Sequence, residues 1–389
     1  MADFGIICEF NPMHNGHIHL INEAKRCGAD RVICVMSGNA VQRGELAIAD
    51  KYTRARIAAD NGADLVLELP YPYCSASAEF FARAGMSILS ELCDNVIFGS
   101  ECGDITLLKE AAEAASTAEF KEKVSDRVAN GEGSARAYFG ELENKGFVGL
   151  SSNDILGIEY IRAAIENGYE INFLTVKREG AEYNSMVLDK GSYPSATALR
   201  NLIGSKGADM LTLDGYMPQN AAWILSDSDK SGVLTDMRDI DTAILSFFRL
   251  HSGDDLKNIA EGGGGLVNRI CSLARESTST EELFEKLRTK RYTDARLRRA
   301  MLFCMTGVTH SLLDKMPEYT LLLAANAKGR EILSENRKSD TLNIITKPAD
   351  VPECGQKTAT EKLDALFTLA RKNKLSASEM LKRIAYIKT

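Results

Sequence analysis

Short apolar runs alternate with helix-period segments through the first half of the chain. The apolar runs are rich in β-branched and other large side chains, and they fall at residues 4–8, 31–36, 64–69, 95–98 and 171–176. Between them, apolar residues recur at helical spacing over residues 18–27, 50–61, 78–92 and 154–166. Short strands that are apolar on both faces and alternate with helices are typical of a parallel sheet covered by helices. We therefore predict an α/β fold with a Rossmann-like, doubly wound parallel sheet.

The pattern changes near residue 205. Strand-like runs stop there, and helix-period segments such as 242–250 and 295–305 dominate to the end of the chain. The glycine run 262–265 is not followed by Lys-Ser or Lys-Thr, so it is not a Walker A phosphate loop. We predict two parts, a Rossmann-like domain over residues 1–205 and a mainly α-helical C-terminal region over residues 206–389.

The composition excludes several classes of protein. Among 389 residues, no apolar run approaches the roughly 20 residues of a membrane span, and no basic segment followed by an apolar one marks a signal peptide. Nine cysteines are scattered without a C-x-x-C pair, which argues against zinc and against a redox dithiol. These features predict a cytoplasmic protein without a membrane partner. The net charge of −7 argues against uniform affinity for nucleic acid but permits a local basic patch.

One loop concentrates the histidines. His14, His17 and His19 are three of the five in the chain, and they follow the first predicted strand directly. Two imidazoles three residues apart can face one anion at the first turn of a helix, and Gly16 between them lets a ligand approach the backbone. The alternative is a polar βα turn, but the position after the first strand favours a phosphate site.

Small, polar or cationic residues follow the other predicted strands as well. In doubly wound sheets, ligands bind at the carboxyl ends of the strands, so these loops should meet around one site. Donors and positive charge of this kind hold a polyphosphate and stabilise charge during nucleotidyl transfer, with no protein nucleophile. Ser195 and Thr197 precede a predicted helix, where either could be only an N-cap. For a small carboxylate or the departing phosphates, the sequence leaves three candidates open: Arg43, Lys51 and Arg54.

These motifs together resemble one family. The His-x-Gly-His pattern resembles the signature of the nucleotidyltransferase superfamily, which includes the class I aminoacyl-tRNA synthetases, and residues 195–200 resemble its second signature. With residues 9–17, 37–45 and 153–160, the chain resembles the bacterial tRNA(Met) cytidine acetate ligases, most strongly over 1–105 and 150–200. It departs from that family's usual pattern at Ala40, commonly aromatic, and at Leu46, commonly proline, which puts the shape of the Arg43 loop in doubt.

The resemblance implies a reaction. ATP activates acetate to acetyl-adenylate with release of pyrophosphate, and the acetyl group passes to N4 of the wobble cytidine of elongator tRNA(Met), forming N4-acetylcytidine. Mg²⁺ could accompany the ATP, although the sequence shows no protein metal site, and the oligomeric state is left open. Two rival functions are a small-molecule adenylyltransferase of the same superfamily and a non-catalytic, nucleotide-dependent RNA-binding factor.

The resemblance also implies site residues. His14 and His17 are the catalytic donors to the α-phosphate. Asn153 alone would more readily be read as a helix cap, and Arg178 alone as a surface cation. The implied ATP-binding residues are Ile7, Cys8, Glu9, Phe10, Asn11, Pro12, Met13, His14, Asn15, Gly16, His17, Ile18, His19, Leu20, Gly99, Asn153, Arg178, Ser195, Thr197 and Arg200.

A basic run is the candidate contact for tRNA. Seven cations and one acid lie between positions 286 and 299. A single-sign run on an acidic protein favours contact with a phosphate backbone, whereas the usual alternative is a solvated helix face. The tRNA-binding candidates are Lys290, Arg291, Arg296, Arg298 and Arg299.

Overall fold

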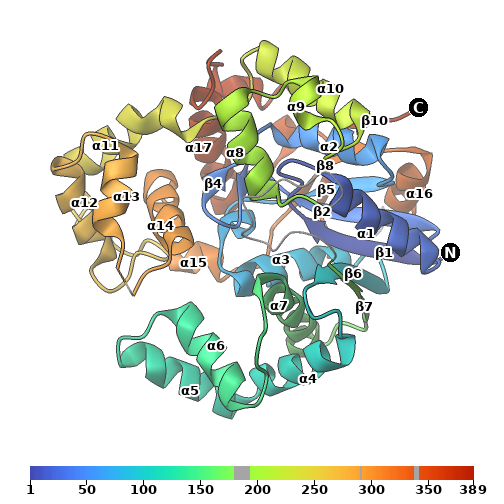
Figure 1. The fold of residues 1–389 in the computed structure, drawn as a ribbon, viewed down its shortest axis with the longest axis horizontal. Helices are drawn as coiled ribbons and strands as arrows, with labels where there is room; N and C mark the ends of the chain where they lie inside the picture. Colours follow the sequence, from blue (N-terminus) through green and yellow to red (C-terminus); the bar gives the residue numbers. More distant parts are fainter. Residues whose placement is uncertain (179–192, 290, 337–340) are drawn as a thin grey trace.

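The sheet at the centre of the molecule is mixed but mostly parallel. A computed structural model describes residues 1–178, 193–289, 291–336 and 341–389, and every element below lies in those ranges. Neighbouring strands run in the order β10, β8, β5, β2, β1, β6, β7, and β9 pairs with β8 (Figure 1). Their bounds are β1 (Asp3–Cys8), β2 (Arg31–Ser37), β5 (Leu65–Leu69), β6 (Asn95–Ser100), β7 (Asn172–Lys177), β8 (Thr320–Ala325), β9 (Ile344–Ile345) and β10 (Tyr386–Ile387).

Strands β5, β2, β1, β6 and β7 run parallel, which confirms the predicted doubly wound α/β fold. All seven residues of β2 are buried, and this explains why its sequence is apolar on both faces. From β1 the chain builds the sheet toward β2 and β5 on one side, and β6 and β7 lie on the other. Strands β1 and β6 therefore flank a topological switch point, and the loops after them open on one crevice.

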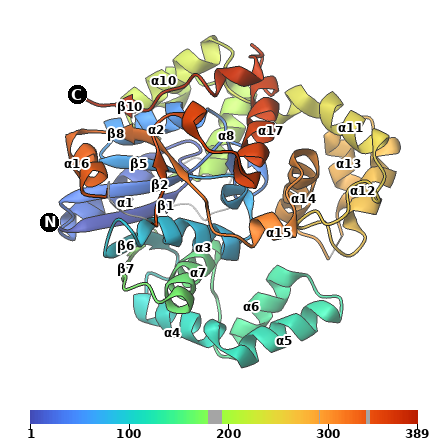
Figure 2. The same cartoon turned by 180° about the vertical axis from the view of Figure 1, so that it is seen from behind.

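Alternate residues of each strand enter two separate cores. In β2, Ile33 and Val35 belong to one apolar cluster, whereas Val32, Cys34 and Met36 belong to the other. The first cluster includes buried side chains of α3, α4 and α7, and the second includes those of α1, α2, α8 and α10. Figures 1 and 2 show these helices on the two faces of the sheet. The bounds are α1 (Asn15–Arg26), α2 (Lys51–Asp60), α3 (Ala78–Leu89), α4 (Ile105–Ser116), α7 (Ser152–Asn167), α8 (Ala196–Lys206) and α10 (Gln219–Lys230).

Two groups of helices extend from this layered body. A helical pair forms an arm beside α4, and a helical lobe lies beside α17 (Figure 1). The pair is α5 (Ala118–Ala129) and α6 (Ser134–Asn144), and the lobe is α11 (Asp241–Leu250), α12 (Leu266–Arg275), α13 (Thr280–Leu287), α14 (Asp294–Thr306) and α15 (His310–Leu313). The remaining helices are α9 (Met210–Leu213), α16 (Ala327–Glu335), α17 (Gly355–Leu369) and the 3₁₀ turns η1 (Tyr73–Ser75), η2 (Met237–Ile240), η4 (Pro348–Asp350) and η5 (Ala377–Glu379).

The expectation that strands stop near residue 205 is wrong. Strands β8, β9 and β10 come from the C-terminal part, and β8 pairs antiparallel with β5 inside the main sheet. All six residues of β8 are buried. Its sequence, Thr-Leu-Leu-Leu-Ala-Ala, is short and made mostly of good helix formers, so periodicity could not distinguish it from a buried helix turn. The C-terminal region is mainly helical but completes the sheet, and a domain boundary at residue 205 stays a prediction.

Candidate active site

A pocket opens at the switch point between β1 and β6. The loop after β1, the end of β6 and the residue after β7 contribute Asn11, Gly99 and Arg178. Residues in the first turns of α1, α7 and α8 complete the lining. A helix start favours an anion, because its first N–H groups have no partner within the helix and the helix dipole is positive there. The residues implied for ATP that line the pocket are Ile7, Cys8, Glu9, Phe10, Asn11, His14, Gly16, His17, His19, Leu20, Gly99, Asn153, Arg178, Thr197 and Arg200.

The other implied ATP residues do not line this pocket. Met13 is buried in the core below the loop, and Asn15 donates through its backbone and side chain to the carbonyl oxygens of Tyr216 and Gly215. Ser195 is the N-cap of α8, where its hydroxyl accepts from the Ala198 N–H at 3.1 Å. These residues shape the helix starts, and Pro12 and Ile18 likewise lie outside the lining.

Both imidazoles that the sequence analysis predicts to be catalytic are fixed by the first turn of α1. Nδ1 of His14 accepts from the Gly16 N–H at 3.1 Å, and Nδ1 of His17 accepts from the His14 N–H at 3.2 Å. The two bonds form a capping box, and the ring centroids lie 3.8 Å apart. A neutral imidazole that accepts at Nδ1 carries its proton on Nε2. The backbone therefore makes each neutral ring a donor through Nε2.

The protonation state of the rings follows from their surroundings. Burial lowers the pKa of His14 to about 3, and the charge of Arg178 adds to this effect. Burial also lowers the pKa of His17 well below its usual value, with further repulsion from His14 and Arg178. Both rings are consequently uncharged at neutral pH, which preserves the hydrogen-bonding pattern of the capping box.

Gly16 is required by the packing of the rings. A Cβ at this position would lie 3.0 Å from Cε1 of His14 and 3.5 Å from Cβ of Tyr193. The first of these contacts is tighter than a packed side chain tolerates without displacing its neighbour. The glycine therefore keeps the His14 ring in place as well as opening the backbone to a ligand.

On the opposite side of the pocket, Glu101 orients two predicted ligands. Nδ2 of Asn153 donates to Oε1 of Glu101 at 2.5 Å, and Nε of Arg178 lies 3.6 Å from the same oxygen. The helix cap of α7 is made by Ser151 and Asp154, so Asn153 is not that cap. The sequence-based set of site residues omits Glu101, although its position directly after β6 was the available signal.

The start of α8 places a hydroxyl and a guanidinium at the pocket. Nη1 of Arg200 donates to the Asn11 carbonyl oxygen at 2.8 Å, and Nη2 donates to Oγ1 of Thr197 at 3.3 Å. Asn11 belongs to the loop after β1, so Arg200 joins the two signature segments across 189 positions of sequence. The structure brings together the two motifs that the sequence analysis paired only by resemblance.

A small hairpin forms one wall of the pocket. Its strands are β3 (Ala40–Val41) and β4 (Glu45–Leu46), and the turn between them presents Gln42 and Arg43 to the lining. Ala40 and Leu46, the two positions that depart from the family pattern, are paired with each other in this hairpin. The two departures therefore fall on one cross-strand pair and leave the turn that carries Arg43 intact.

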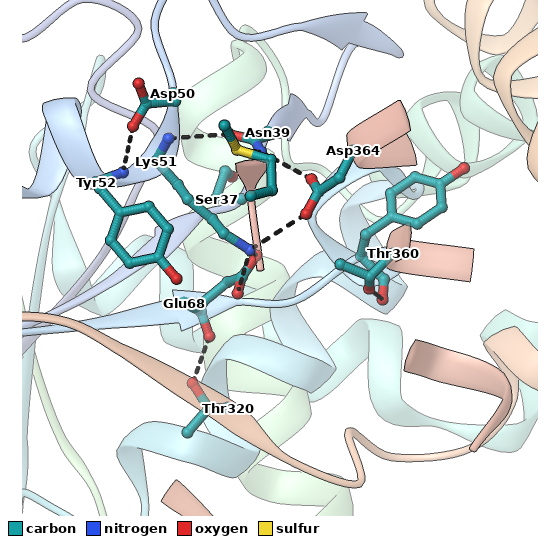
Figure 3. A network of polar contacts seen from close by, with 12 residues as sticks. Ser37, Asn39, Asp50, Lys51, Tyr52, Glu68, Thr320, Thr360 and Asp364 are labelled. Carbon is teal, nitrogen blue, oxygen red and sulfur yellow. Dashed lines mark hydrogen bonds and ion pairs between the residues drawn. The ribbon is translucent and has the colours of Figure 1, made fainter. Parts of the chain in front are cut away.

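Lys51 lies outside the pocket, in a buried polar network (Figure 3). Its Nζ donates to both oxygens of Glu68, at 2.8 and 2.9 Å, and lies 4.0 Å from Oδ2 of Asp364. Nδ2 of Asn39 donates to Oδ1 of Asp364 at 2.7 Å, which ties α17 to the residue that precedes the hairpin. Burial opposes the charge on Lys51, but Glu68 and Asp364 outweigh it and raise the lysine pKa. Lys51 therefore remains charged inside the protein.

Arg54 is also occupied by the protein itself. Its guanidinium donates to the carbonyl oxygens of Ala49, Glu9, Ser37 and Gly38, and 1% of the residue is exposed. Lys51 and Arg54 thus support the loops around the pocket, whereas Arg43 is the one of the three carboxylate candidates that lines it.

The basic run is largely neutralised by acids of other segments. Arg296 and Arg299 pair with Glu261, and Arg298 pairs with Glu45 of the hairpin at 3.0 Å. A Cβ at Gly44 would lie 2.4 Å from the backbone nitrogen of Arg299, so the middle of α14 packs directly against the hairpin. Arg291 is exposed beside the Tyr292 ring, and Lys290 lies outside the described residues. Arg298 and Arg299 therefore have a structural partner that the sequence did not reveal.

Two further features concern the described residues only. No helix in those ranges has both the length and the apolarity that crossing a bilayer requires. In the same ranges, no three His, Cys, Asp or Glu side chains gather as ligands for a metal ion. The cytoplasmic location and the role of Mg²⁺ stay predictions.

The chain resembles known proteins over its whole length. A family model described as HIGH nucleotidyl transferase matches residues 1–381. A tRNA(Met) cytidine acetate ligase of Acetivibrio thermocellus is 35% identical, with 90% of this chain and 89% of the relative covered. A ligase of the same name from Clostridium perfringens is 36% identical, with 88% and 89% covered.

Two solved structures have the same fold. The apo form of Thermotoga maritima TmcAL superposes with a TM-score of 0.89 at 31% identity, and all of both chains are covered. A second form of that protein, bound with α-thio ATP, superposes with a TM-score of 0.88 at 30% identity over all of both chains.

Proposed function

The chain belongs to the HIGH nucleotidyl transferase family, and we propose that it is an ATP-dependent tRNA(Met) cytidine acetate ligase. The observation that carries this proposal is the pair of neutral imidazoles fixed beside cations at a helix start, in a chain whose relatives bear that name. The ATP analogue bound to the Thermotoga relative supports ATP as the nucleotide.

The first half-reaction requires charge stabilisation rather than a protein nucleophile. An acetate oxygen attacks the α-phosphorus of ATP, a new P–O bond forms, and the bond to the pyrophosphate oxygen breaks. The Nε2–H groups of His14 and His17 donate to the α-phosphate as negative charge grows on it. The starts of α1 and α8, with Thr197 and Arg200, hold the phosphates that depart.

The adenosine is assigned to the less polar side of the pocket. Phe81, Phe98, Leu156 and Tyr160 line that side, and they offer the apolar and aromatic surface on which a base packs. Asn153 lies at the start of the same helix as Leu156 and supplies a polar group near them. Apolar side chains thus hold the base while the donors at the helix starts hold the phosphates.

Arg43 is the proposed contact for acetate. It lines the pocket from the hairpin turn, whereas Lys51 and Arg54 lie outside the lining. A guanidinium recognises a carboxylate with two donors, and the hairpin can bring it beside the reacting phosphate. The second half-reaction then passes the acetyl group to the cytidine N4 of tRNA(Met), with AMP as the leaving group.

Acetate-dependent exchange of pyrophosphate into ATP tests this function. The assay uses the full-length protein with a panel of small carboxylates, first without RNA and then with bulk tRNA, each with and without Mg²⁺. Exchange with acetate above all others supports acetyl-adenylate formation, and transfer of labelled acetate to tRNA(Met) completes the assignment. Exchange with another carboxylate, or none with tRNA present, would contradict it.

A further inference from the structure

We propose that the Glu9 carboxylate accepts the proton that the cytidine N4 amine loses during acetyl transfer. The inference rests on the proposed function and assigns the acid–base residue of its second half-reaction. Glu9 directly follows β1, five positions before His14, and lines the pocket.

Glu9 stands out by its charge. Among the described residues that line the pocket it is the one acid, and the cations Arg43, Lys177, Arg178 and Arg200 surround the same space. A carboxylate repels a polyphosphate, so binding ATP does not explain this residue type. A different step of the reaction should therefore use it.

The carboxylate is held in place but is only partly satisfied. Oε1 accepts from the Gln42 N–H at 2.8 Å, and the Glu9 carbonyl oxygen accepts from Nη1 of Arg54 at 2.6 Å. No hydrogen bond or ion pair to Oε2 is found within the described ranges. One oxygen is thus fixed by the hairpin that carries Arg43, and the other remains available to a substrate.

The two histidines cannot take this role. Their Nδ1 atoms already accept backbone N–H groups, and their Nε2 atoms carry protons. Burial raises the pKa of Glu9 above its ordinary value, although the Gln42 N–H and the charges of Arg200, Arg54 and Arg43 oppose this. A carboxylate with a raised pKa is a stronger base near neutral pH than an ordinary one.

The proposed step is balanced. The N4 lone pair attacks the acetyl carbonyl carbon of the adenylate, and a C–N bond forms. The bond between that carbon and the phosphate oxygen breaks, and AMP leaves with the electron pair. The proton lost from N4 goes to Glu9, which in the ground state accepts a hydrogen bond from the N4 amine, as carboxylates do from cytosine.

Variants Glu9→Gln and Glu9→Asp separate this role from support of the hairpin. The two half-reactions are measured apart: acetate-dependent pyrophosphate exchange, and single-turnover acetyl transfer to tRNA(Met) across a range of pH. In Glu9→Gln, we expect transfer to fall by about 10²–10³-fold more than exchange falls, as for loss of a general base. In Glu9→Asp, transfer should partly recover, and its rate should again rise with pH, whereas the rate of Glu9→Gln should not.

Glu45→Gln is the matched control for the hairpin. Glu45 lies on β4 and pairs with Arg298 and Arg200, so its loss should loosen the hairpin and the position of Arg200 and lower both half-reactions together. If Glu9→Gln shows the same parallel loss, or keeps the pH dependence of transfer, then Glu9 only holds the hairpin and the inference is overturned. If the unmodified protein shows no acetate-dependent exchange, the proposed function fails and this inference with it.

Discussion

The pocket and the buried network around Lys51 are both built from charged side chains near the carboxyl ends of β1, β2 and β5, yet their charges act differently. In the pocket, Thr197 and Arg200 line the cavity together with one acid, Glu9, and the carboxylate of Glu45 lies 3.6 Å from Arg200. In the network, Lys51 is matched by Glu68 and Asp364, and almost none of it is exposed. A cation near a strand end therefore indicates a ligand site only if its side chain lines an open pocket, and Lys51 does not.

The two regions are nevertheless coupled through the hairpin. The carbonyl oxygen of Asn39 accepts from the Ala47 N–H, while its side chain is held by Asp364 and by the Lys51 N–H. The hairpin between Asn39 and Ala47 carries Arg43 into the pocket. The network thus supports one wall of the site without contacting the substrates.

The largest expected effect is on folding, from Lys51→Met. This change leaves Glu68 and Asp364 buried without their cation, and breaking one side of a buried pair costs about 3–5 kcal/mol. Denaturant unfolding measures the loss in free energy of unfolding. The double variant Lys51→Met with Glu68→Gln should recover part of it. If Lys51→Met instead kept its stability but bound acetate more weakly, Lys51 would belong to the substrate site.

Next in size is the effect of His17 variants on catalysis. Loss of one donor to the α-phosphate should reduce acetate-dependent pyrophosphate exchange by about 10²–10³-fold. His17→Asn is the matched control for His17→Ala, because its side-chain oxygen can still accept from the His14 N–H and cap the helix. Both variants should lose exchange, but Asn should be the more stable in thermal unfolding. Near-normal exchange in either one would remove His17 from the chemistry.

A smaller effect concerns the pH dependence of stability. The pKa of His14 is about 3 in the folded protein, below the roughly 6.5 of an unfolded chain. The neutral ring therefore stabilises the fold fully above about pH 6.5, and this contribution is lost as the pH falls toward 3. One such group contributes up to about 1.4 kcal/mol per pH unit, or about 2 kcal/mol between about pH 6.5 and pH 5. Denaturant unfolding at several pH values measures the slope of the free energy of unfolding against pH. In His14→Asn the part of this slope that comes from His14 should disappear, whereas an unchanged slope would mean that His14 is protonated in the folded state.

The smallest effect is expected at the RNA surface. Arg291 is exposed in the loop between α13 and α14 of the helical lobe. Arg291→Ala should weaken tRNA binding, and the slope of the logarithm of the tRNA binding constant against the logarithm of the salt concentration should fall by about one. Exchange without tRNA is the internal control. Arg299→Ala should behave differently, because Arg299 pairs with Glu261 beside the hairpin and its loss should lower exchange as well. Equal loss of tRNA binding and of exchange in Arg291→Ala would argue against a separate RNA contact.

Local sequence determined the parallel core and the helix start that we propose binds phosphate. The buried strands had to be apolar on both faces, and His14, Gly16 and His17 form their capping box within four consecutive residues. Interactions of this kind depend on neighbours along the chain, so a pattern of residues is enough to predict them. The family motifs add ATP and the substrates to this local picture.

Tertiary structure alone decided which cations line the pocket. In the sequence, four other cations look like Arg43, but they lie outside the lining of the pocket: Lys51, Arg54, Arg298 and Arg299. Their partners across the fold are Glu68, backbone carbonyl oxygens, Glu45 and Glu261. Tertiary structure also decided the place of strand β8, because β8 pairs with β5, whose residues lie more than 250 positions away in the sequence. Partners so distant in sequence leave no periodic signal, and burial and charge pairing are fixed only when the segments pack together.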